Sequence, residues 1–232
     1  MIYLNDGNNF LLELLPKGNG KVLDCGCGAG DNARILQSQG WEVTGITSQV
    51  AEEKLASRFC KSVIIADLDA GMPREIGPYD IILFSHILEH LKDPIKILME
   101  SKKMLVPGGL IGVALPNFLY YKNRLDFLLG KFEYSPEGGL IDKTHLRFFT
   151  FKSGAALLEA ADFKILQKKT DGNFPLWKAR QVLPESLIKF LNHLANRFLP
   201  GLFGYQCVYI ARSFESKLWI DPISFGNGID QT

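Results

Sequence analysis

Three glycines on alternate positions follow an aspartate near the start of the chain, in the stretch KVLDCGCGAGDNARIL. Gly26, Gly28 and Gly30 come directly after an apolar run, and Asp24 lies near the end of that run. Glycine inside regular structure costs roughly 0.5–1 kcal/mol relative to alanine, so three of them indicate a turn where a ligand touches the backbone. A helix that begins there offers free N–H groups to that ligand. The spacing therefore predicts a ligand-binding strand-to-helix turn, with a plain tight turn as the alternative.

Polar side chains also follow the next four apolar runs along the chain. These are Thr47, Ser48 and Gln49, then Asp67 beside Leu68, then Ser85 and His86, and finally Asn117. Strands buried on both faces read as continuous apolar runs, and ligands bind beyond the carboxyl ends of parallel strands. We therefore expect these side chains to lie with the glycines around one binding site.

The glycines and polar residues lie between apolar runs that alternate with helical patterns, which indicates strands and helices in alternation. We expect strands at 21–25, 42–46, 62–66, 79–85, 110–115, 163–170 and 205–213. We expect helices at 31–39, 50–59, 152–161 and from 94 to the Pro-Gly-Gly at 107–109. In the helix at 50–59, the apolar side chains that share one side are Val50, Ala51, Leu55 and Phe59. Helical crossovers between the first five strands predict a parallel, doubly wound sheet with right-handed connections.

The acid and three alternating glycines resemble the first motif of the class I S-adenosylmethionine-dependent methyltransferases. The resemblance extends from about Lys21 to Ser213 and implies an α/β, Rossmann-like, doubly wound sheet of seven strands, mostly parallel with the last antiparallel. A dinucleotide site has a different spacing, Gly-x-Gly-x-x-Gly, and an acid about 20 residues later. An NAD-dependent oxidoreductase and a non-catalytic interaction subunit with a cofactor fold are the alternatives.

The resemblance also implies which residues bind S-adenosyl-L-methionine. The glycines would make room for its methionine and ribose portions, and Asp24 would arrange its amino group. Asp67 would accept a hydrogen bond from the adenine amino group, Leu68 would supply a backbone contact, and Ser85 would line the pocket. The acid that binds ribose in the family is replaced by Thr47-Ser48-Gln49, so neutral Ser48 or Gln49 could bind the ribose hydroxyls.

His86, Glu89 and His90 stand at i, i+3 and i+4, which predicts that they share one helical face. Some O-methyltransferases, among them small-RNA 2′-hydroxyl and ubiquinone-pathway enzymes, hold a divalent ion with a Glu-x-x-Glu-His set. His86 stands here in place of the first Glu. We expect that Glu89 and His90 tie this segment to its neighbours and that no metal is held, with a metal site as the alternative.

The segment 116–150 is rich in aromatic and basic residues. It resembles the corresponding segment of bacterial methyltransferases found with polysaccharide and other glycan biosynthesis genes, and the similarity continues to the sequence THLRFFT near its end. Its aromatic candidates for binding a sugar or ring are Tyr120, Tyr121, Phe132 and Tyr134. Its basic candidates for a phosphate or carboxylate are Arg124, Lys143 and Arg147. We place Asn117 and His86 with them as acceptor-binding residues. An insertion that only packs aromatics over the sheet is the alternative.

His145, in the same segment, is the candidate base. Methyl transfer is an in-line displacement, and a hydroxyl acceptor must lose its proton as the new bond forms. A neutral imidazole with a pKa near 6.5 suits that task. A hydrogen-bonded packing histidine is the alternative. We therefore expect O-methylation of a sugar, a glycan precursor or another small hydroxylated acceptor.

Net charge, apolar runs and cysteine content predict where the protein acts and what it does not bind. The 232 residues carry a formal net charge of +1, which argues against binding to bulk nucleic acid. No apolar run approaches the roughly 20 residues that span a bilayer, and the first residues lack the pattern of a secretory signal. The four cysteines have no zinc-ligand spacing and indicate reduced thiols, so we expect a cytoplasmic protein.

We expect one domain over 1–213 and a tail over 214–232, with insertions at 116–150 and 171–203 that cover the acceptor site. The second insertion holds a helical pattern whose apolar members are Leu187, Leu191, Leu194 and Phe198. That face could cover the active site, pack in a homodimer or contact a membrane surface.

Overall fold

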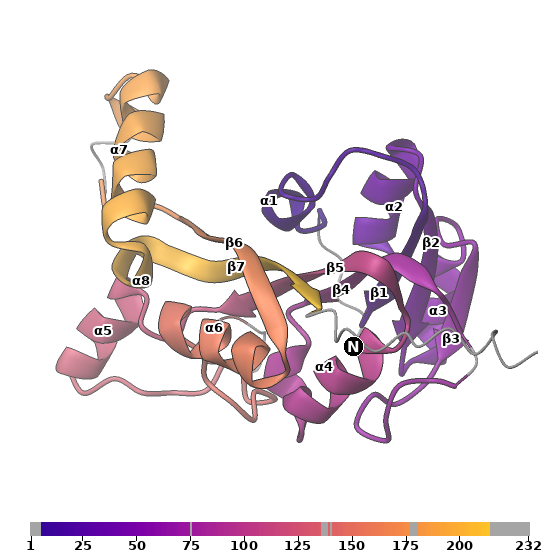
Figure 1. Cartoon of the computed structure of the whole chain (residues 1–232). Coiled ribbons are helices and arrows are strands. Elements are labelled where there is room, and N and C mark those ends of the chain that lie inside the picture. The colour runs from indigo at the N-terminus through magenta and orange to yellow at the C-terminus, as the bar shows by residue number, and fades with distance from the viewer. Residues whose placement is uncertain (1–5, 75, 136–138, 140, 177–180, 214–232) are drawn as a thin grey trace, which may run out of the picture.

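A computed structural model describes residues 6–74, 76–135, 139, 141–176 and 181–213 (Figure 1). The expected tail over 214–232 lies outside the described residues. Seven strands form one sheet in the order β3-β2-β1-β4-β5-β7-β6. They are β1 (Lys21–Cys25), β2 (Glu42–Thr47), β3 (Ser62–Ile65), β4 (Tyr79–Ser85), β5 (Leu105–Pro116), β6 (Phe163–Gly172) and β7 (Gly204–Ser213).

Helices cover both faces of this sheet. In chain order, the helical segments of the structure are α1 (Asn9–Leu12), α2 (Asp31–Ser38), α3 (Val50–Ala56), the 3-10 turn η1 (Leu88–His90), α4 (Pro94–Lys102), α5 (Tyr121–Leu128), α6 (Phe151–Ala160), α7 (Glu185–Phe198) and α8 (Pro200–Phe203). In Figure 1, α1 and α2 lie above the sheet and α4 and α6 lie below it. Each face has its own apolar core, one containing Leu11 and Leu36 and the other containing Leu98 and Leu158.

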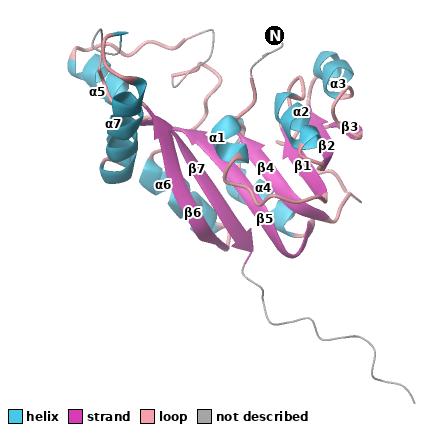
Figure 2. Ribbon diagram, turned by 90° about the horizontal axis from the view of Figure 1, so that it is seen from above, coloured by secondary structure: helices cyan, strands magenta, loops and turns pink. Residues whose placement is uncertain are grey.

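The strand pairing confirms the expected topology. β1 lies between β2 and β4 and pairs parallel with both, and β7 pairs antiparallel with β5 and β6. Figure 2 shows β6 and β7 at one edge of the sheet and β3 at the other. Because β1 and β4 are neighbours, the order of strands reverses beside the glycine turn, which is where such sheets bind ligands.

The side of α3 that carries Val50 and Ala51 does not face the core. Val50 is 59% exposed, whereas Glu52 and Ala56 are buried. The buried carboxylate of Glu52 is acceptable because it accepts a hydrogen bond of 2.5 Å from the Thr47 hydroxyl. The fifth strand also begins earlier than expected, at Leu105, so that the Pro-Gly-Gly sequence lies inside β5.

The amphipathic helix α7 rises from the β6–β7 edge (Figure 1). Its polar side holds it there, because the Asn192 side chain accepts from the Phe174 N–H at 2.9 Å and that of Asn196 accepts from the Thr170 hydroxyl at 3.1 Å. Most of its apolar side is open, with Phe198 70% exposed. No α-helix of the described residues is long and apolar enough to cross a membrane. All four cysteines are buried and unpaired.

Candidate active site

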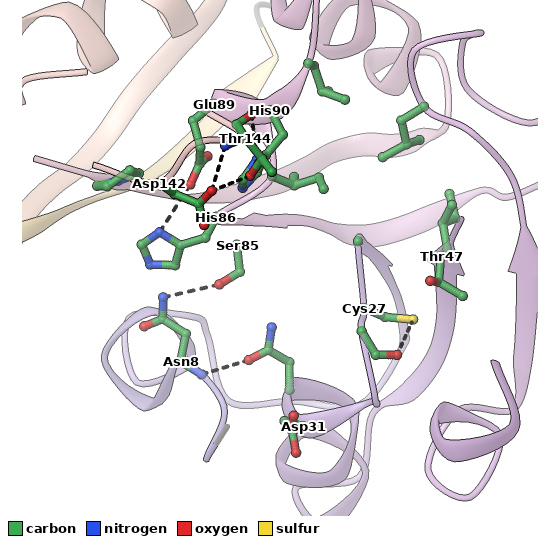
Figure 3. Close-up of a pocket in the computed structure, with 18 of the residues that line it drawn as sticks. Asn8, Cys27, Asp31, Thr47, Ser85, His86, Glu89, His90, Asp142 and Thr144 are labelled. Atoms are coloured by element: carbon green, nitrogen blue, oxygen red, sulfur yellow. Dashed lines mark hydrogen bonds and ion pairs between the residues drawn. The ribbon is translucent and has the colours of Figure 1, made fainter. Parts of the chain in front are cut away.

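A cavity of about 1130 Å³ opens along the carboxyl edge of the sheet. The residues expected to bind the cofactor that line it are Gly26, Gly28, Thr47, Ser48, Gln49, Asp67, Leu68 and Ser85. In Figure 3, Cys27 and Thr47 lie at one end and His86, Glu89 and His90 at the other. The cavity therefore joins the glycine turn to the histidine-rich segment.

The glycine turn adopts the left-handed conformation that its residue types predict. The φ angles are +75° at Gly26, +53° at Gly28 and +88° at Gly30, which side chains rarely adopt. A Cβ at Gly30 would lie 2.9 Å from the Cα of Ala56, so this glycine lets α3 approach and does not line the cavity. The N–H groups of Gly26 and Cys27 both donate to the Ile46 carbonyl at 2.9 Å, which fixes the turn against β2.

Asp24 lies beneath this turn and is fully buried. Neither of its carboxylate oxygens has a hydrogen-bond partner among the described residues, and it does not line the cavity. Burial raises the pKa of Asp24 to about 7, although the nearby Asn32 amide lowers it in part. The carboxyl group is therefore poised to ionise near neutral pH.

Glu52 is a site residue that the sequence analysis missed. Its carboxylate lies beside Thr47 and lines the cavity. Glu52 therefore places an acid near the end of β2. It stands five residues after Thr47, where the family has the acid that binds ribose. The available signal was the run of neutral Thr47-Ser48-Gln49 ahead of a glutamate in the first turn of α3.

Asp67 follows β3 and is exposed at the cavity. Its Oδ1 accepts from the Asp69 N–H at 2.9 Å, which closes a local turn and holds the carboxylate in place. Leu68, next to it, is buried. The carboxylate that the resemblance assigns to the adenine amino group is thus held by the chain and exposed at the cavity.

His86 does not share a helical face with Glu89 and His90, contrary to the sequence prediction. Its backbone has a φ of +54°, and the helical turn begins only at Leu88. Its Nε2 lies 3.0 Å from Gln206 Oε1, and its Nδ1 lies 3.5 Å from Glu89 Oε1. Partial burial would lower the pKa of His86, but the Glu89 carboxylate raises it overall.

The structure brings His145 to the segment that follows β4. Donor atoms of Glu89, His90 and His145 lie within 4.8 Å of one another, and the two imidazole rings are 4.8 Å apart, edge to face. The His90 Nδ1 lies 3.2 Å from the Thr144 carbonyl and 3.0 Å from its hydroxyl, which in turn donates to Asp142 at 2.7 Å. These three side chains could hold a divalent cation.

The other expected acceptor-binding residues lie outside the cavity. Asn117 is buried, and its amide donates to the Gly204 carbonyl at 2.7 Å. The Arg124 Nε donates to the Leu119 carbonyl at 2.7 Å, and Arg147 donates to the Lys92 carbonyl. The rings of Tyr120 and Tyr121 pack against each other, and Tyr134 is 54% exposed beside Phe132. These contacts pack the 116–150 segment and join it to β7 and to Lys92.

The sequence analysis also missed a chain of polar side chains beside His86. The Asn8 amide donates to Ser85 Oγ at 3.2 Å and to Gln206 Oε1 at 2.9 Å. The Gln206 Nε2 and the Tyr205 hydroxyl both donate to Asp171 Oδ2, at 3.1 and 2.5 Å. The available signal in the sequence was a glutamine within the apolar run of β7, and the structure leaves it only 5% exposed.

The cavity has a one-sided charge pattern. Its acidic lining residues are Asp31, Glu52, Asp67, Asp69, Glu89, Asp142 and Asp171, and no lysine or arginine of the described residues lines it. Arg124 and Arg147, which were expected to bind an anionic acceptor, donate to backbone carbonyls elsewhere, and Lys143 does not line the cavity. Among its described residues, the lining therefore offers no lysine or arginine to pair with a phosphate group of an acceptor.

The chain matches known methyltransferases in sequence. A family model described as "Methyltransferase domain" matches residues 4–168. The ubiquinone biosynthesis O-methyltransferase of Psychrobacter arcticus is 32% identical over 97 residues, 38% of this chain and 38% of that protein. That of Vibrio cholerae is 31% identical over 111 residues, 44% of each. The chain thus spans about two-fifths of the length of these curated relatives.

Solved structures show the same fold. The structure of a SAM-dependent methyltransferase from Archaeoglobus fulgidus has a TM-score of 0.57 and 20% identity, and the match covers 85% of this chain and 87% of that chain. The family match covers most of the residues that build the sheet and the cavity. This chain therefore belongs to the methyltransferase domain family and has the fold of the S-adenosylmethionine-dependent methyltransferases.

Proposed function

We propose that the protein transfers the methyl group of S-adenosylmethionine to a hydroxyl oxygen of a small, uncharged acceptor, such as a sugar or glycan precursor. One observation carries this proposal. A single cavity joins the glycine turn, where the donor binds, to a cluster of imidazoles that can act on a hydroxyl group. An open cavity also argues against a non-catalytic subunit with a blocked pocket.

The donor half of the site follows from the polar groups at the strand ends. Asp67 accepts from the adenine amino group, while Glu52 and Thr47 receive the ribose hydroxyls. The turn at Gly26 and Gly28 leaves room for the methionine portion. The methyl group then points toward Ser85 and the histidines, where the acceptor must approach opposite the sulfur.

The acceptor half favours a neutral molecule with several hydroxyl groups. Asn8, Gln206 and Asp171 offer amide and carboxylate groups for hydrogen bonds, and the described lining supplies no cation for a phosphate. The two O-methyltransferases among the relatives support oxygen as the atom methylated. His145 acts on that oxygen in one of two ways: as a base that takes the proton, or as a ligand of a cation that lowers the hydroxyl pKa.

Calorimetric titration with S-adenosylmethionine and with NAD tests the donor. We expect saturable binding of the first and none of the second, and the reverse result would contradict the proposal. Transfer from radiolabelled donor to a panel of hydroxylated sugars and phenols, each paired with its phosphate ester, tests the acceptor. We expect product with neutral members only.

The His145→Ala variant tests the role of the imidazole. We expect turnover to fall by roughly 10²–10⁴ with unchanged affinity for the donor. His193→Ala, in the exposed side of α7, is the matched control. Full activity of His145→Ala would remove this residue from the mechanism.

A further inference from the structure

We propose that Glu89, His90 and His145 bind a divalent cation of the kind that prefers nitrogen and oxygen ligands, such as Mn²⁺, Co²⁺ or Zn²⁺. Two imidazoles and one carboxylate with open positions are a common ligand set for such ions. One donor atom of each residue lies within 4.8 Å of the others. His145 is 55 positions beyond His90 in the sequence, so the fold assembles this set.

Glu89 provides the independent evidence for a ligand. Its side chain is 0% exposed, and neither carboxylate oxygen has a hydrogen-bond partner among the described residues. The His86 Nδ1 lies 3.5 Å from its Oε1, which is too far for a strong hydrogen bond. Removing a carboxylate from water costs several kcal/mol unless its oxygens are paired or coordinate a metal. A cation beside His90 and His145 would supply that partner.

His90 is oriented as a metal ligand requires. The Thr144 hydroxyl donates its hydrogen bond to Asp142 Oδ1, so toward the His90 Nδ1 the same oxygen can only accept. The Thr144 carbonyl accepts from the same nitrogen. Nδ1 therefore carries the proton, and Nε2 keeps a lone pair. Figure 3 shows His90 beside Thr144 and Asp142. Metal-binding histidines are commonly held by such a hydrogen bond from the second ring nitrogen to a carbonyl or carboxylate.

His86 is excluded from the set by its own contacts. Its Nε2 donates to Gln206 Oε1, because the amide nitrogen of Gln206 is committed to Asp171. Its other ring nitrogen, Nδ1, faces the Glu89 carboxylate. Both ring nitrogens of His86 thus have neighbours in the protein, and His86 is not among the residues whose donor atoms lie within 4.8 Å of one another. The proposed set thus differs from the His86-Glu89-His90 set considered on sequence spacing.

Cation binding does not depend on the proposed methyl transfer, but the two would share one cavity. The bound ion would lower the pKa of an acceptor hydroxyl that coordinates it. In that case His145 positions the ion, and its loss removes binding of the cation as well as turnover.

Direct binding tests the site without an acceptor. The purified full chain is stripped with a chelator, dialysed free of it, and titrated with Mn²⁺ by calorimetry and with Co²⁺ by visible absorption. We expect one ion per chain and Co²⁺ bands of a site with nitrogen ligands. Absence of binding by both ions would overturn the proposal.

Single variants test the ligand set. We expect Glu89→Gln, His90→Gln and His145→Gln each to weaken Mn²⁺ binding by at least tenfold. His86→Gln and His193→Gln retain it, as matched histidine controls. Circular dichroism of each variant establishes that it is folded, and the rise of the thermal midpoint with Mn²⁺ gives a second readout. Binding that survives His145→Gln, or that is lost with His86→Gln alone, would overturn the assignment. S-adenosylmethionine affinity measured on the same samples reports separately on the donor site.

Discussion

The buried carboxyl group of Asp24 makes stability depend on pH in a direction opposite to that of most acids. Its pKa is about 7 in the folded chain, against 3.8 as the ordinary value. Between these pH values the folded protein holds a proton that the unfolded chain has lost. The free energy of unfolding therefore falls as pH rises from about 4 to about 7, and the contribution of this group is constant above that range.

The size of the effect follows from the same two values. Each tenfold change in proton affinity is worth about 1.4 kcal/mol, so the difference corresponds to about 4 kcal/mol. Asp24→Asn keeps the shape of the side chain and removes its titration. Its buried amide has a cost of its own, about 1–3 kcal/mol if it finds no partner, but that cost is the same at every pH. The variant must therefore gain about 4 kcal/mol on the parent between pH 4 and pH 8.

Urea unfolding of both proteins without cofactor at pH 4, 5, 6, 7 and 8 measures this difference. Glu159→Gln, which changes an exposed carboxylate of α6, is the control and should show no such trend. A gap between Asp24→Asn and the parent that stays constant within about 1 kcal/mol over this range would refute the reasoning.

Four further substitutions, of which Gly40→Ala is a control, test the packing of the glycine turn and the donor half of the site. Gly30→Ala and Gly40→Ala both place a side chain in the left-handed region, at about 1–2 kcal/mol each, but only Gly30 meets the Ala56 Cα at 2.9 Å. We expect Gly30→Ala to lose about 1–3 kcal/mol more by urea unfolding, and equal midpoints would contradict the packing argument. Asp67→Asn keeps the turn to Asp69 and should weaken S-adenosylmethionine binding by about tenfold in calorimetry, since a hydrogen bond to a charged group is worth about 1.5–3 kcal/mol. Glu52→Gln should do the same if Glu52 receives the ribose hydroxyls, and unchanged affinity would remove it from the site.

The sequence alone determined the fold and the place of the site. Apolar runs of strand length and the acid-glycine spacing depend on neighbours in the chain, so β1, β4 and the turn at Gly26 could be predicted closely. Parallel strands place their carboxyl ends at one edge, which brought Thr47, Asp67 and Ser85 to the same cavity as expected. Even so, Gly30 proved to serve helix packing, because only the structure shows what a Cβ there would meet.

Tertiary structure decided which polar side chains face one another. Helical spacing put His86 with Glu89 and His90, but the chain leaves β4 through a left-handed residue at His86 and turns that side chain toward Gln206. The side chain that lies beside Glu89 and His90 is instead that of His145, from a distant segment of the chain. Such contacts depend on loop conformation and on partners far away in the chain, which no local pattern encodes. Glu52 has a nearer partner, the Thr47 hydroxyl, but only the packing of α3 against β2 shows that its carboxylate is buried there.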